Sequence, residues 1–367
     1  MKKGVSMRTL PELEISLDAL ADNARRLKER CNAAGIEVVP VLKSLRSASE
    51  VVRACARGGL VHVADSRVEN LVRLKADNPD ASRCMLIRSP MIGQVEAAVE
   101  ACDCILVSER HILVSLSDAA RAAHRTINVV PMIDVGDRRE GMSPDQLVAF
   151  ARYAMMLSGL HVAGVATNLG CFARVQATPR NHQLLVRSAQ TLRDQLGLAC
   201  ETVSTGGTLT LALVEHGAMP AGITQVRIGE ALVLGTSTAD GRFIPWLRQD
   251  TAILRAEIIE LQDKQAEPEG LVRSDIAGPG PRLRVSSKGL RRRAVVALGK
   301  MDTDIDGLTP VMDGAVVLGG SSDHLIVDIS DGESNVATGD VLEFRLSYAA
   351  LARAAASPYV HCIYTGA

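Results

Sequence analysis

The sequence predicts a (β/α)8 barrel followed by an all-β domain, and two patterns along the chain carry this prediction. Between about residues 36 and 230, eight short apolar runs alternate with longer amphipathic segments. Beyond about residue 238, short apolar runs are separated by Gly, Asp and Pro turns, with no long helical segment between them. The first pattern is typical of parallel strands joined by helices, and the second of strands joined by turns.

The eight runs of the first region are expected to be buried strands, because their apolar residues are continuous rather than alternating. They are residues 36–42, 60–65, 84–89, 102–108, 127–134, 160–167, 200–204 and 223–229. The segments between them are expected to be helices, most clearly residues 178–196, which begin with an N-cap Thr178 and end before Gly197. Eight strand–helix units predict a closed barrel with its active site at the carboxyl ends of the strands.

The second region is expected to fold as a separate all-β domain. Its predicted strands are residues 251–262, 292–299, 314–320, 323–330 and 340–346, with a short Ala-rich helix near 348–356. The expected domains are therefore residues 1–237 for the barrel and 238–367 for the β domain. The early run at 13–18 precedes the barrel and is a candidate to join the β domain.

Composition argues against several classes of partner. Lys and Arg number 41 and Asp and Glu number 42, so there is no excess of positive charge to attract nucleic acid or a membrane surface. The first residues lack the apolar run of a secretory signal, and no stretch approaches the length of a membrane span. We therefore expect a cytoplasmic protein that acts on a small molecule.

Lys43 ends the first predicted barrel strand, in the run VVPVLKS. A lysine at this place would point into the barrel mouth, where burial lowers its pKa and favours imine formation. The loops at residues 204–208 (STGGT) and 227–229 (RIG) follow strands seven and eight, where barrels usually bind phosphate through exposed backbone N–H groups. A strand-end lysine together with these two loops predicts a pyridoxal 5′-phosphate (PLP) site.

Two further polar residues follow predicted strands five and six. Arg139, in DVGDRREGM, is suited to pair with a substrate carboxylate or with the phenolic oxygen of the cofactor. Asn168, in ATNLGCF, ends strand six and is a candidate to hydrogen-bond the cofactor.

The order of these motifs resembles the alanine racemase superfamily, the fold-type III PLP enzymes, over nearly the whole chain. The matching segments are LEISLDALADNARRL, Lys43, DVGDRREGM, TNLG, the Gly/Thr loop and VRIGEALVLG, followed by GAVVLGGSSDHLIVDIS, which looks like that family's strand pair near the dimer interface. The segments ADSRVENL, TNLGCF, DGLTP, SSDHLIVD and SPYV look most like the ornithine racemase-like branch.

The resemblance implies a role for each matching position. Lys43 would hold the cofactor and act as base or acid on one face of Cα. Arg227 would face the pyridine nitrogen, and Arg139 would lie near the phenolic oxygen and the substrate carboxylate. The phosphate would be held by Thr205, Gly206, Gly207, Thr208, Ile228 and Gly229, with Tyr364 as a C-terminal phosphate-binding tyrosine and Tyr359 as its competitor.

One position departs from the family pattern. Alanine racemases use a tyrosine from the partner's β domain as the base on the opposite face, in a Gly-Tyr-x-Asp motif. Here Lys300 stands in the tyrosine's place, between Gly299 and Met301. The second base is therefore Lys300 or a neighbour such as Asp323 or His324, and the resemblance implies a homodimer with shared active sites.

An arginine beside the pyridine nitrogen favours racemisation over competing reactions. Its pKa is too high for it to protonate that nitrogen, so a carbanion formed there is quickly reprotonated. Arg227 thus argues against the nearest enzymatic alternative, a fold-type III amino-acid decarboxylase. A non-catalytic PLP carrier would generally be a barrel alone, and a metal-assisted aldolase would need a richer metal set than His324 and Cys362.

The branch resemblance implies a free basic amino acid, such as ornithine, as the substrate. Acidic residues near the presumed mouth that are candidates to meet its distal ammonium are Glu140, Glu230, Asp302, Asp304 and Asp306. The sequence therefore predicts a PLP-dependent amino-acid racemase that removes and returns the Cα proton with two bases.

Overall fold

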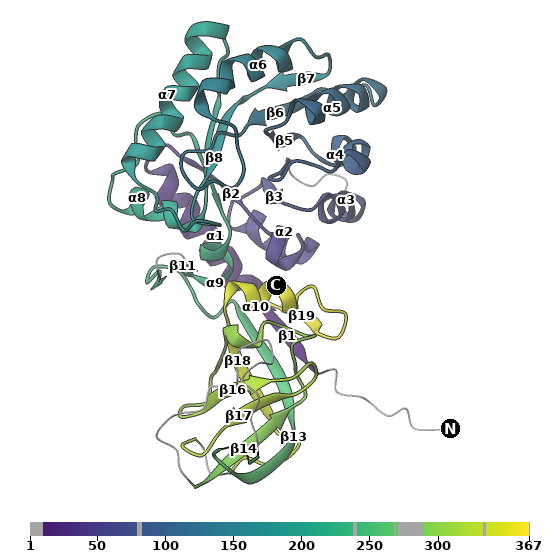
Figure 1. Ribbon diagram of the computed structural model, residues 1–367, viewed down its shortest axis with the longest axis vertical. Coiled ribbons are helices and arrows are strands. Elements are labelled where there is room, and N and C mark those ends of the chain that lie inside the picture. The colour runs from purple at the N-terminus through teal and green to yellow at the C-terminus, as the bar shows by residue number, and fades with distance from the viewer. Residues whose placement is uncertain are drawn as a thin grey trace. The chain divides into compact units, whose positions relative to one another are not determined.

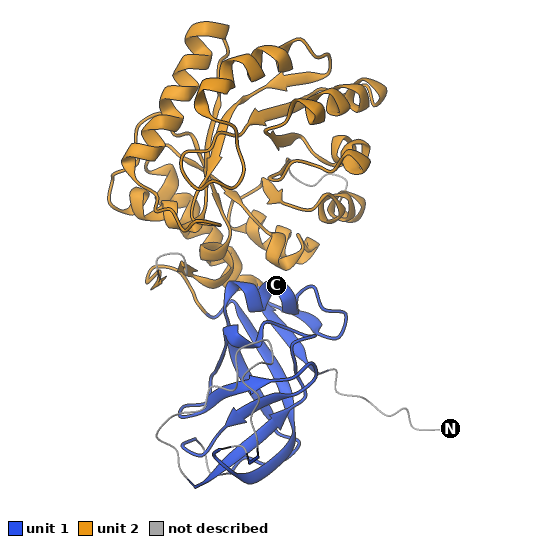
Figure 2. Cartoon of the chain, viewed as in Figure 1, with its two compact units in different colours: residues 1–16, 250–367 blue, residues 17–249 orange. Residues whose placement is uncertain are grey.

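The chain forms two compact units, residues 17–249 and residues 1–16 together with 250–367 (Figure 2). The computed structural model describes residues 10–78, 83–237, 241–267, 269–270, 289–332 and 335–366. The first unit is built from parallel strands and helices, and the second mainly from antiparallel strands (Figure 1).

Parallel strands form a closed ring in the first unit. They are β2 (Glu37–Pro40), β3 (Val63–Asp65), β4 (Cys84–Leu86), β5 (Cys104–Val107), β6 (Ile127–Pro131), β7 (Leu160–Val162), β8 (Gly164–Asn168), β9 (Thr202–Gly206) and β10 (Gln225–Ile228). Their pairing follows the orders β2-β10-β9-β8 and β3-β4-β5-β6-β7. Parallel bridges between Val41 and Ala64 and between Met132 and Ala166 join the two sets. The predicted (β/α)8 barrel is confirmed.

The sixth predicted strand is divided at Ala163 into β7 and β8. Ala163 donates its N–H to Val129 O at 3.1 Å, and its own oxygen accepts from Thr202 N at 3.1 Å. Gly164 permits the close approach to β9, because a β-carbon there would lie 1.8 Å from Thr202 O. The division therefore lets β7 pair with β6 while β8 pairs with β9.

Helices lie between the strands and around the ring (Figure 1). They are α1 (Leu17–Asn32), α2 (Ser49–Arg57), α3 (Val68–Asp77), α4 (Val95–Ala101), α5 (Arg110–Ala122), α6 (Leu147–Met155), α7 (Pro179–Leu196), α8 (Leu211–Glu215) and α9 (Glu230–Leu234). Helix α7 begins as predicted, since Thr178 Oγ1 accepts from Asn181 N at 3.3 Å, and it ends at Gly197 with φ 66°. In the described ranges, no helix combines the length and the apolar character needed to cross a membrane.

Aliphatic side chains from the strands pack the barrel core. One cluster contains Val39, Val41, Ala64 and Met85, and a second contains Leu106, Val130, Met132 and Ala166. Most of these residues are β-branched or small, and such side chains fit the pleated wall of a barrel in layers. The strands are thereby held in a fixed register, which sets where each strand-end residue lies.

A short extension after the last barrel helix stays with the barrel unit. It contains β11 (Thr236–Ser237) and β12 (Arg242–Phe243), which pair with each other, and it buries Ile244 and Leu247. Asn23 of α1 holds it by accepting from Arg248 N at 2.7 Å and donating to Arg248 O at 2.9 Å. The boundary expected after residue 237 falls inside this extension, between β11 and β12, whereas the compact unit continues to residue 249.

The described residues of the second unit form an eight-stranded sheet, confirming the all-β fold predicted for the second domain. Its strands are β1 (Glu12–Ser16), β13 (Ala252–Gln265), β14 (Leu290–Val296), β15 (Leu308–Pro310), β16 (Val316–Gly320), β17 (Leu325–Asp328), β18 (Val341–Leu346) and β19 (His361–Thr365), and α10 spans Tyr348–Ala354. The early strand β1 lies between β13, to which it is antiparallel, and β19, to which it is parallel. Arg255 of β13 ties this sheet together through ion pairs with Glu14 of β1 and, at 2.8 Å, with Glu343 of β18.

Candidate active site

Lys43 begins a short 3-10 turn, Lys43–Leu45, just beyond the first barrel strand. The wall continues to Val41, whose N–H donates to Ile228 O at 2.7 Å. The chain then turns away, and the Lys43 side chain is exposed. The burial expected from the sequence is wrong, because the strand ends before the lysine rather than at it. Lys43 nevertheless lies at the carboxyl end of the barrel, next to the end of β10.

The turn that carries Lys43 is fixed by a buried carboxylate. Arg46 and Ser47 both adopt left-handed backbone conformations, with φ of 55° and 47°. Ser47 Oγ donates to Asp65 Oδ2 at 2.7 Å, and Asn70 Nδ2 donates to the same oxygen at 3.0 Å. Asp65 is fully buried at the end of β3, and burial raises the pKa of its carboxyl group. Sequence reasoning missed Asp65, although its place as the last residue of the second predicted strand was a usable signal.

The two predicted phosphate loops lie side by side. Gly207 N donates to Arg227 O at 3.2 Å, and Thr208 Oγ1 accepts from Ala231 N at 3.1 Å. Within the described part of the chain, no acceptor takes the backbone N–H of Thr208 or of Gly229. Gly207 has φ +108°, and a β-carbon there would lie 2.8 Å from Leu169 O, so the loop needs glycine at this point. The arrangement leaves two backbone donors and one hydroxyl free to meet an anion.

Thr205 turns its side chain away from the site. Its hydroxyl lies 3.0 Å from His182 Nε2, on helix α7. His182 Nδ1 lies within 3.0 Å of Thr178 O and Asn181 Oδ1, both acceptors, so this nitrogen carries the proton and Nε2 accepts from Thr205. The Thr205 hydroxyl therefore has no hydrogen left for a phosphate, and only its backbone remains for the predicted role. Ile228 follows Arg227 in β10, and successive side chains of a strand point to opposite faces. Because Arg227 faces inward, the Ile228 side chain faces outward, and only its backbone remains for the predicted role.

Arg227 is the deeply buried cation of the site. It is 3% exposed, and burial lowers the pKa of its guanidinium to about 10. Nη1 donates to Ser204 Oγ at 2.6 Å, and Nη2 donates to Thr167 O at 2.7 Å. Among the described residues, Arg227 forms no ion pair within 4.0 Å. The guanidinium is thus protonated at neutral pH and held by neutral groups.

Arg139, in the loop after β6, and Asn168, at the end of β8, lie close together. When the Asn168 amide is turned so that its oxygen faces donors, that oxygen accepts from Arg139 Nη2 at 3.2 Å and from Leu169 N at 3.1 Å. Glu140 Oε2 lies 3.8 Å from Arg139 Nη2, and its other oxygen accepts from Ser89 N at 3.5 Å. Glu140 and Arg139 also act on buried Arg227, the carboxylate favouring its charged form and Arg139 opposing it.

Asp137, which sequence reasoning missed, joins the loop after β6 to the loop after β8. It is 2% exposed, and its carboxylate accepts from Phe172 N at 3.2 Å and from Ala173 N at 3.3 Å. These two bonds fix the loop that carries Arg139 against the loop that follows Asn168. The motif DVGDRREGM offered the signal, since an aspartate two residues before a candidate arginine is well placed to hold the arginine's loop.

The three candidates for a second base lie together in the β unit. Lys300 N donates to Ser321 O at 3.0 Å, which joins its loop to the loop that carries Asp323 and His324. All three candidate side chains are exposed. Gly299 allows this close approach, because a β-carbon there would lie 1.9 Å from Ser322 O.

The two tyrosine candidates have different settings in the same unit. Tyr364 is half-buried in β19, where it pairs with Ile15 of β1. Tyr359 is 62% exposed in the loop before β19. The structure therefore gives Tyr364 a fixed backbone position and leaves Tyr359 at the surface.

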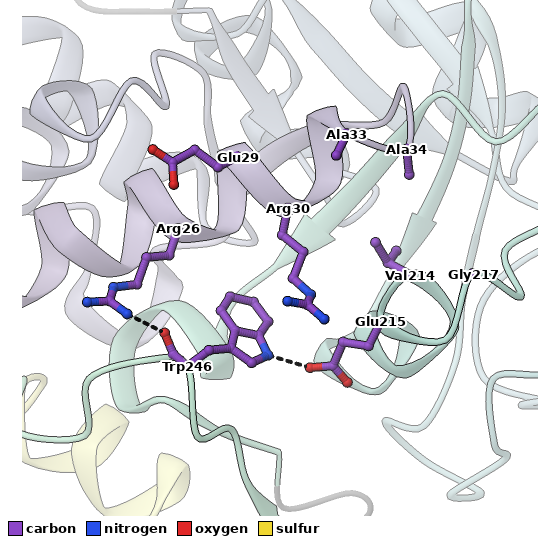
Figure 3. A pocket seen from close by; sticks show the side chains of 9 residues that line it. All are labelled: Arg26, Glu29, Arg30, Ala33, Ala34, Val214, Glu215, Gly217 and Trp246. Carbon is purple, nitrogen blue, oxygen red and sulfur yellow. Dashed lines mark hydrogen bonds between the residues drawn. The ribbon is translucent and has the colours of Figure 1, made fainter.

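A surface hollow of about 710 Å³ lies elsewhere on the barrel unit, along α1 and α8 (Figure 3). Trp246 Nε1 donates to Glu215 Oε1 at 2.7 Å there, and the Arg30 guanidinium lies 5.1 Å from the centre of the tryptophan ring. The carboxylates of this hollow form ion pairs, Glu29 with Arg25 at 2.9 Å and Glu215 with Arg242 at 2.8 Å. No predicted site residue lines the hollow. In the described ranges, no three His, Cys, Asp or Glu side chains are grouped so as to hold a metal ion.

Known proteins with similar sequences include racemases. The model of the family "Alanine racemase, N-terminal domain" matches residues 15–237. The chain is 34% identical to the lysine racemase of Thermotoga maritima over 354 residues, which cover 96% of this chain and 98% of that protein. It is also 34% identical to the ornithine racemase of Acetoanaerobium sticklandii over 351 residues, covering 95% of this chain and 98% of that protein.

A solved structure agrees on the fold of both units. The alanine racemase of Streptomyces lavendulae matches with a TM-score of 0.76 at 22% identity, covering 99% of this chain and 98% of that chain. The family match spans the barrel, and the two curated relatives extend it through the β unit. This chain therefore belongs to the alanine racemase family, and it is a racemase-family enzyme of the PLP-dependent fold-type III class.

Proposed function

We propose that this protein is a PLP-dependent racemase of a free basic amino acid, with Lys43 holding the cofactor and Arg227 facing its ring nitrogen. The observation that carries the proposal is the buried guanidinium of Arg227, which is held by Ser204 and Thr167 and has no carboxylate partner in the described chain. The near full-length match to lysine and ornithine racemases supports the same assignment.

The donors at the carboxyl end of the barrel fit PLP. Its phosphate would be held by the unpaired N–H groups of Thr208 and Gly229 and by the Thr208 hydroxyl. Its aldehyde would meet the exposed amine of Lys43, and its phenolic oxygen would meet Arg139, with Asn168 holding that guanidinium. When bound, PLP supplies an electron sink for the electron pair left at Cα after its proton is removed.

Arg227 supports racemisation rather than decarboxylation. With a pKa of about 10, its guanidinium stays protonated at neutral pH and does not pass a proton to a pyridine nitrogen. Without a proton on its ring nitrogen, bound PLP would be a weaker electron sink, which would favour return of the proton to Cα over its delivery to another atom of the cofactor. A site that protonates the ring nitrogen would need a carboxylate there. Among the described residues, no carboxylate lies within ion-pair distance of the Arg227 guanidinium.

Inversion requires a proton donor on each face of Cα. Lys43 serves one face, and we assign the other to Lys300, with Asp323 and His324 as the neighbouring alternatives on the adjoining loop. All three are exposed on the β unit and so are accessible to a second copy of the chain. The proposed assembly is a two-fold homodimer in which each β unit completes the partner's site.

Among the candidate acidic residues, Glu140 is the best placed to bind a distal ammonium. Its side chain is 20% exposed, and its contacts with Arg139 Nη2 and Ser89 N are long, at 3.8 and 3.5 Å. Two other candidates have closer partners: Glu230 Oε1 accepts from Thr236 Oγ1 at 2.8 Å, and Asp302 Oδ2 accepts from Gly299 N at 2.7 Å. Asp304 lies in the β unit, where Arg353 is 3.5 Å away. We therefore propose Glu140 as the residue that favours lysine and ornithine.

The test is a panel of single L-enantiomers incubated with the PLP-loaded protein and analysed by chiral chromatography. We expect D-lysine or D-ornithine to form much faster than D-alanine. Glu140→Gln should raise KM for the basic substrate about tenfold, the value of one charged hydrogen bond, and Glu96→Gln, at an exposed helix position, should not. Carbon dioxide release would identify a decarboxylase, and PLP binding without turnover would identify a carrier; either result rejects the proposal.

A further inference from the structure

Three polar residues of neighbouring strands share one layer of the barrel wall. Gln225 of β10 is the register partner of Ser204 in β9 and of Glu37 in β2. Ser204 is fully buried and Gln225 is 6% exposed. Arg227 occupies the next inward-facing position of β10, two residues nearer the carboxyl end. The layer therefore lies directly beneath the arginine assigned to the cofactor ring.

These residues form an unbroken chain of hydrogen bonds. Arg227 Nη1 donates to Ser204 Oγ at 2.6 Å, Ser204 Oγ donates to Gln225 Oε1 at 2.8 Å, and Gln225 Nε2 donates to Glu37 Oε2 at 2.9 Å. The direction of every bond is fixed by its ends, because a guanidinium only donates and an ionised carboxylate only accepts. The Gln225 amide can therefore take only one orientation while the chain is complete.

The hydrogen-bond chain ends in a contact between Glu37 and His62, at the opposite end of the barrel from the candidate site. Glu37 is the first residue of β2, and its other oxygen lies 2.7 Å from Nδ1 of His62, just before β3. The hydrogen bond from His62 holds the pKa of the Glu37 carboxyl group below its ordinary value. The Glu37 side chain is 46% exposed, so solvent screens its charge and its effect on Arg227 is smaller than that of the buried bonds.

The orientation of the Arg227 guanidinium depends on this chain of hydrogen bonds. Its other described hydrogen bond goes to the backbone oxygen of Thr167, which holds Nη2 but not Nη1. A long side chain with one end free has several rotamers, whereas two bonds from separate nitrogens select one. Without Gln225, Ser204 Oγ would be free to rotate its hydroxyl hydrogen toward other acceptors and would hold the guanidinium less firmly.

We propose that Gln225 is a positioning residue for the reaction: through Ser204 it holds the Arg227 guanidinium toward the cofactor ring, and Glu37 anchors the far end of the chain. This inference rests on the proposed function, in which Arg227 faces the ring nitrogen. Neither Gln225 nor Glu37 would touch substrate or cofactor, since both lie on the amino-terminal side of Arg227.

The test measures how firmly Arg227 is held, in the full-length protein with and without added PLP. Phenylglyoxal modifies accessible arginines, and mass spectrometry gives the rate at Arg227 relative to exposed Arg187. We expect Gln225→Leu to raise the relative rate about tenfold and Glu37→Gln to raise it about threefold, the smaller value reflecting solvent screening. The control Glu29→Gln, at a 61%-exposed carboxylate of α1, should leave the rate unchanged.

A second readout uses the reaction itself. A displaced guanidinium should raise the ratio of half-transamination to racemisation in both variants, whereas a general loss of folded protein would lower both reactions equally. The double variant Gln225→Glu with Glu37→Gln keeps one carboxylate and one amide in the chain, and it should restore slow modification of Arg227. This variant also covers the case in which Gln225→Leu fails to fold.

Two results would overturn the inference: an unchanged Arg227 rate in Gln225→Leu and Glu37→Gln, or an equal increase in Glu29→Gln. The labelling without PLP separates this inference from the proposed function. If the Arg227 rate depends on Gln225 and no amino acid is racemised, the proposed function fails while the positioning of Arg227 stands. If racemisation is observed and the rate does not depend on Gln225, only the inference fails.

Discussion

The guanidinium of Arg227 crosses directly over Gly206. A β-carbon on Gly206 would lie 2.6 Å from Arg227 Nη2 and 2.5 Å from the side-chain amide of Asn168, both shorter than real carbon contacts. The absence of a side chain at Gly206 is therefore what allows a buried arginine of β10 to reach Thr167 O on β8. The two residues are register partners on adjacent strands, so the contact is built into the barrel wall.

Gly206→Ala should displace Arg227 from its position. The added methyl group has to push the guanidinium or Asn168 aside, which we expect to cost about 1–3 kcal/mol of stability by overpacking. Racemisation should fall about tenfold or more, because the guanidinium is moved from the ring. The matched control is Gly93→Ala, where a β-carbon would meet nothing within 4 Å. Urea unfolding and kcat measure both effects; equal behaviour of the two variants would contradict the contact.

The cofactor is expected to be bound covalently at Lys43. Borohydride reduction of the PLP-loaded protein, followed by peptide mapping, should place the modified lysine in the peptide containing residues 39–46. Lys43→Ala should abolish the label, and Lys264→Ala, at an exposed ion pair of β13, should retain it. A label on another lysine in the wild-type protein, with Lys43 unmodified, would refute the assignment.

His182 is expected to make stability fall in mild acid. It is fully buried, and burial lowers its pKa below the ordinary value of 6.5. The folded state therefore binds a proton less readily than the unfolded state, so its contribution is complete above pH 6.5 and is lost as pH falls through the lower folded-state pKa.

His182→Gln tests this pH dependence. At pH about 7.5 the variant should be less stable by about 1–3 kcal/mol, because the bond to Thr205 or the bond to Thr178 is lost. The difference from the wild type should narrow as pH falls toward 5, as measured by urea unfolding at each pH. His111→Gln, at an exposed position, should leave the pH dependence as it is. A constant difference across the range would show that His182 does not titrate as described.

Subunit mixing tests the proposed second base. Lys43→Ala and Lys300→Ala should each be inactive, and mixing them under conditions that exchange subunits should restore up to about a quarter of the native site activity by random pairing. If Lys300→Ala alone keeps full activity, the role passes to Asp323 or His324. If variants of those residues also keep activity, a base from the partner subunit is refuted.

The sequence was sufficient to predict the barrel because its strands are short, apolar and separated by longer amphipathic helices. Residues at strand ends followed from that pattern, and Lys43, Arg227 and the glycine loops all lie at the carboxyl end of the barrel as predicted. The parallel pairing of β1 with β19 was not predictable, because it joins the two ends of the chain and leaves no local signal.

Side-chain direction was harder to predict than strand position. Thr205 and Ser204 are neighbours in one strand, yet Thr205 faces His182 of α7 and Ser204 faces Arg227, because successive side chains of a strand point to opposite faces. To know whether the Thr205 side chain faces the phosphate, one must know which face of β9 points inward, and a single sequence does not supply this. The chain from Arg227 to Glu37 was hidden for the same reason, since its members are far apart in sequence and meet only through strand pairing.

The most direct test of the central claim follows the Cα proton. Pure L-lysine or L-ornithine is incubated with the PLP-loaded protein in D2O, and both enantiomers are separated and analysed by mass spectrometry at early times. Two-base racemisation predicts deuterium at Cα of the newly formed D-enantiomer, while the remaining L-substrate keeps its protium. Equal labelling of both enantiomers would contradict the two-base mechanism, and the absence of exchange with every basic amino acid would contradict the proposed function.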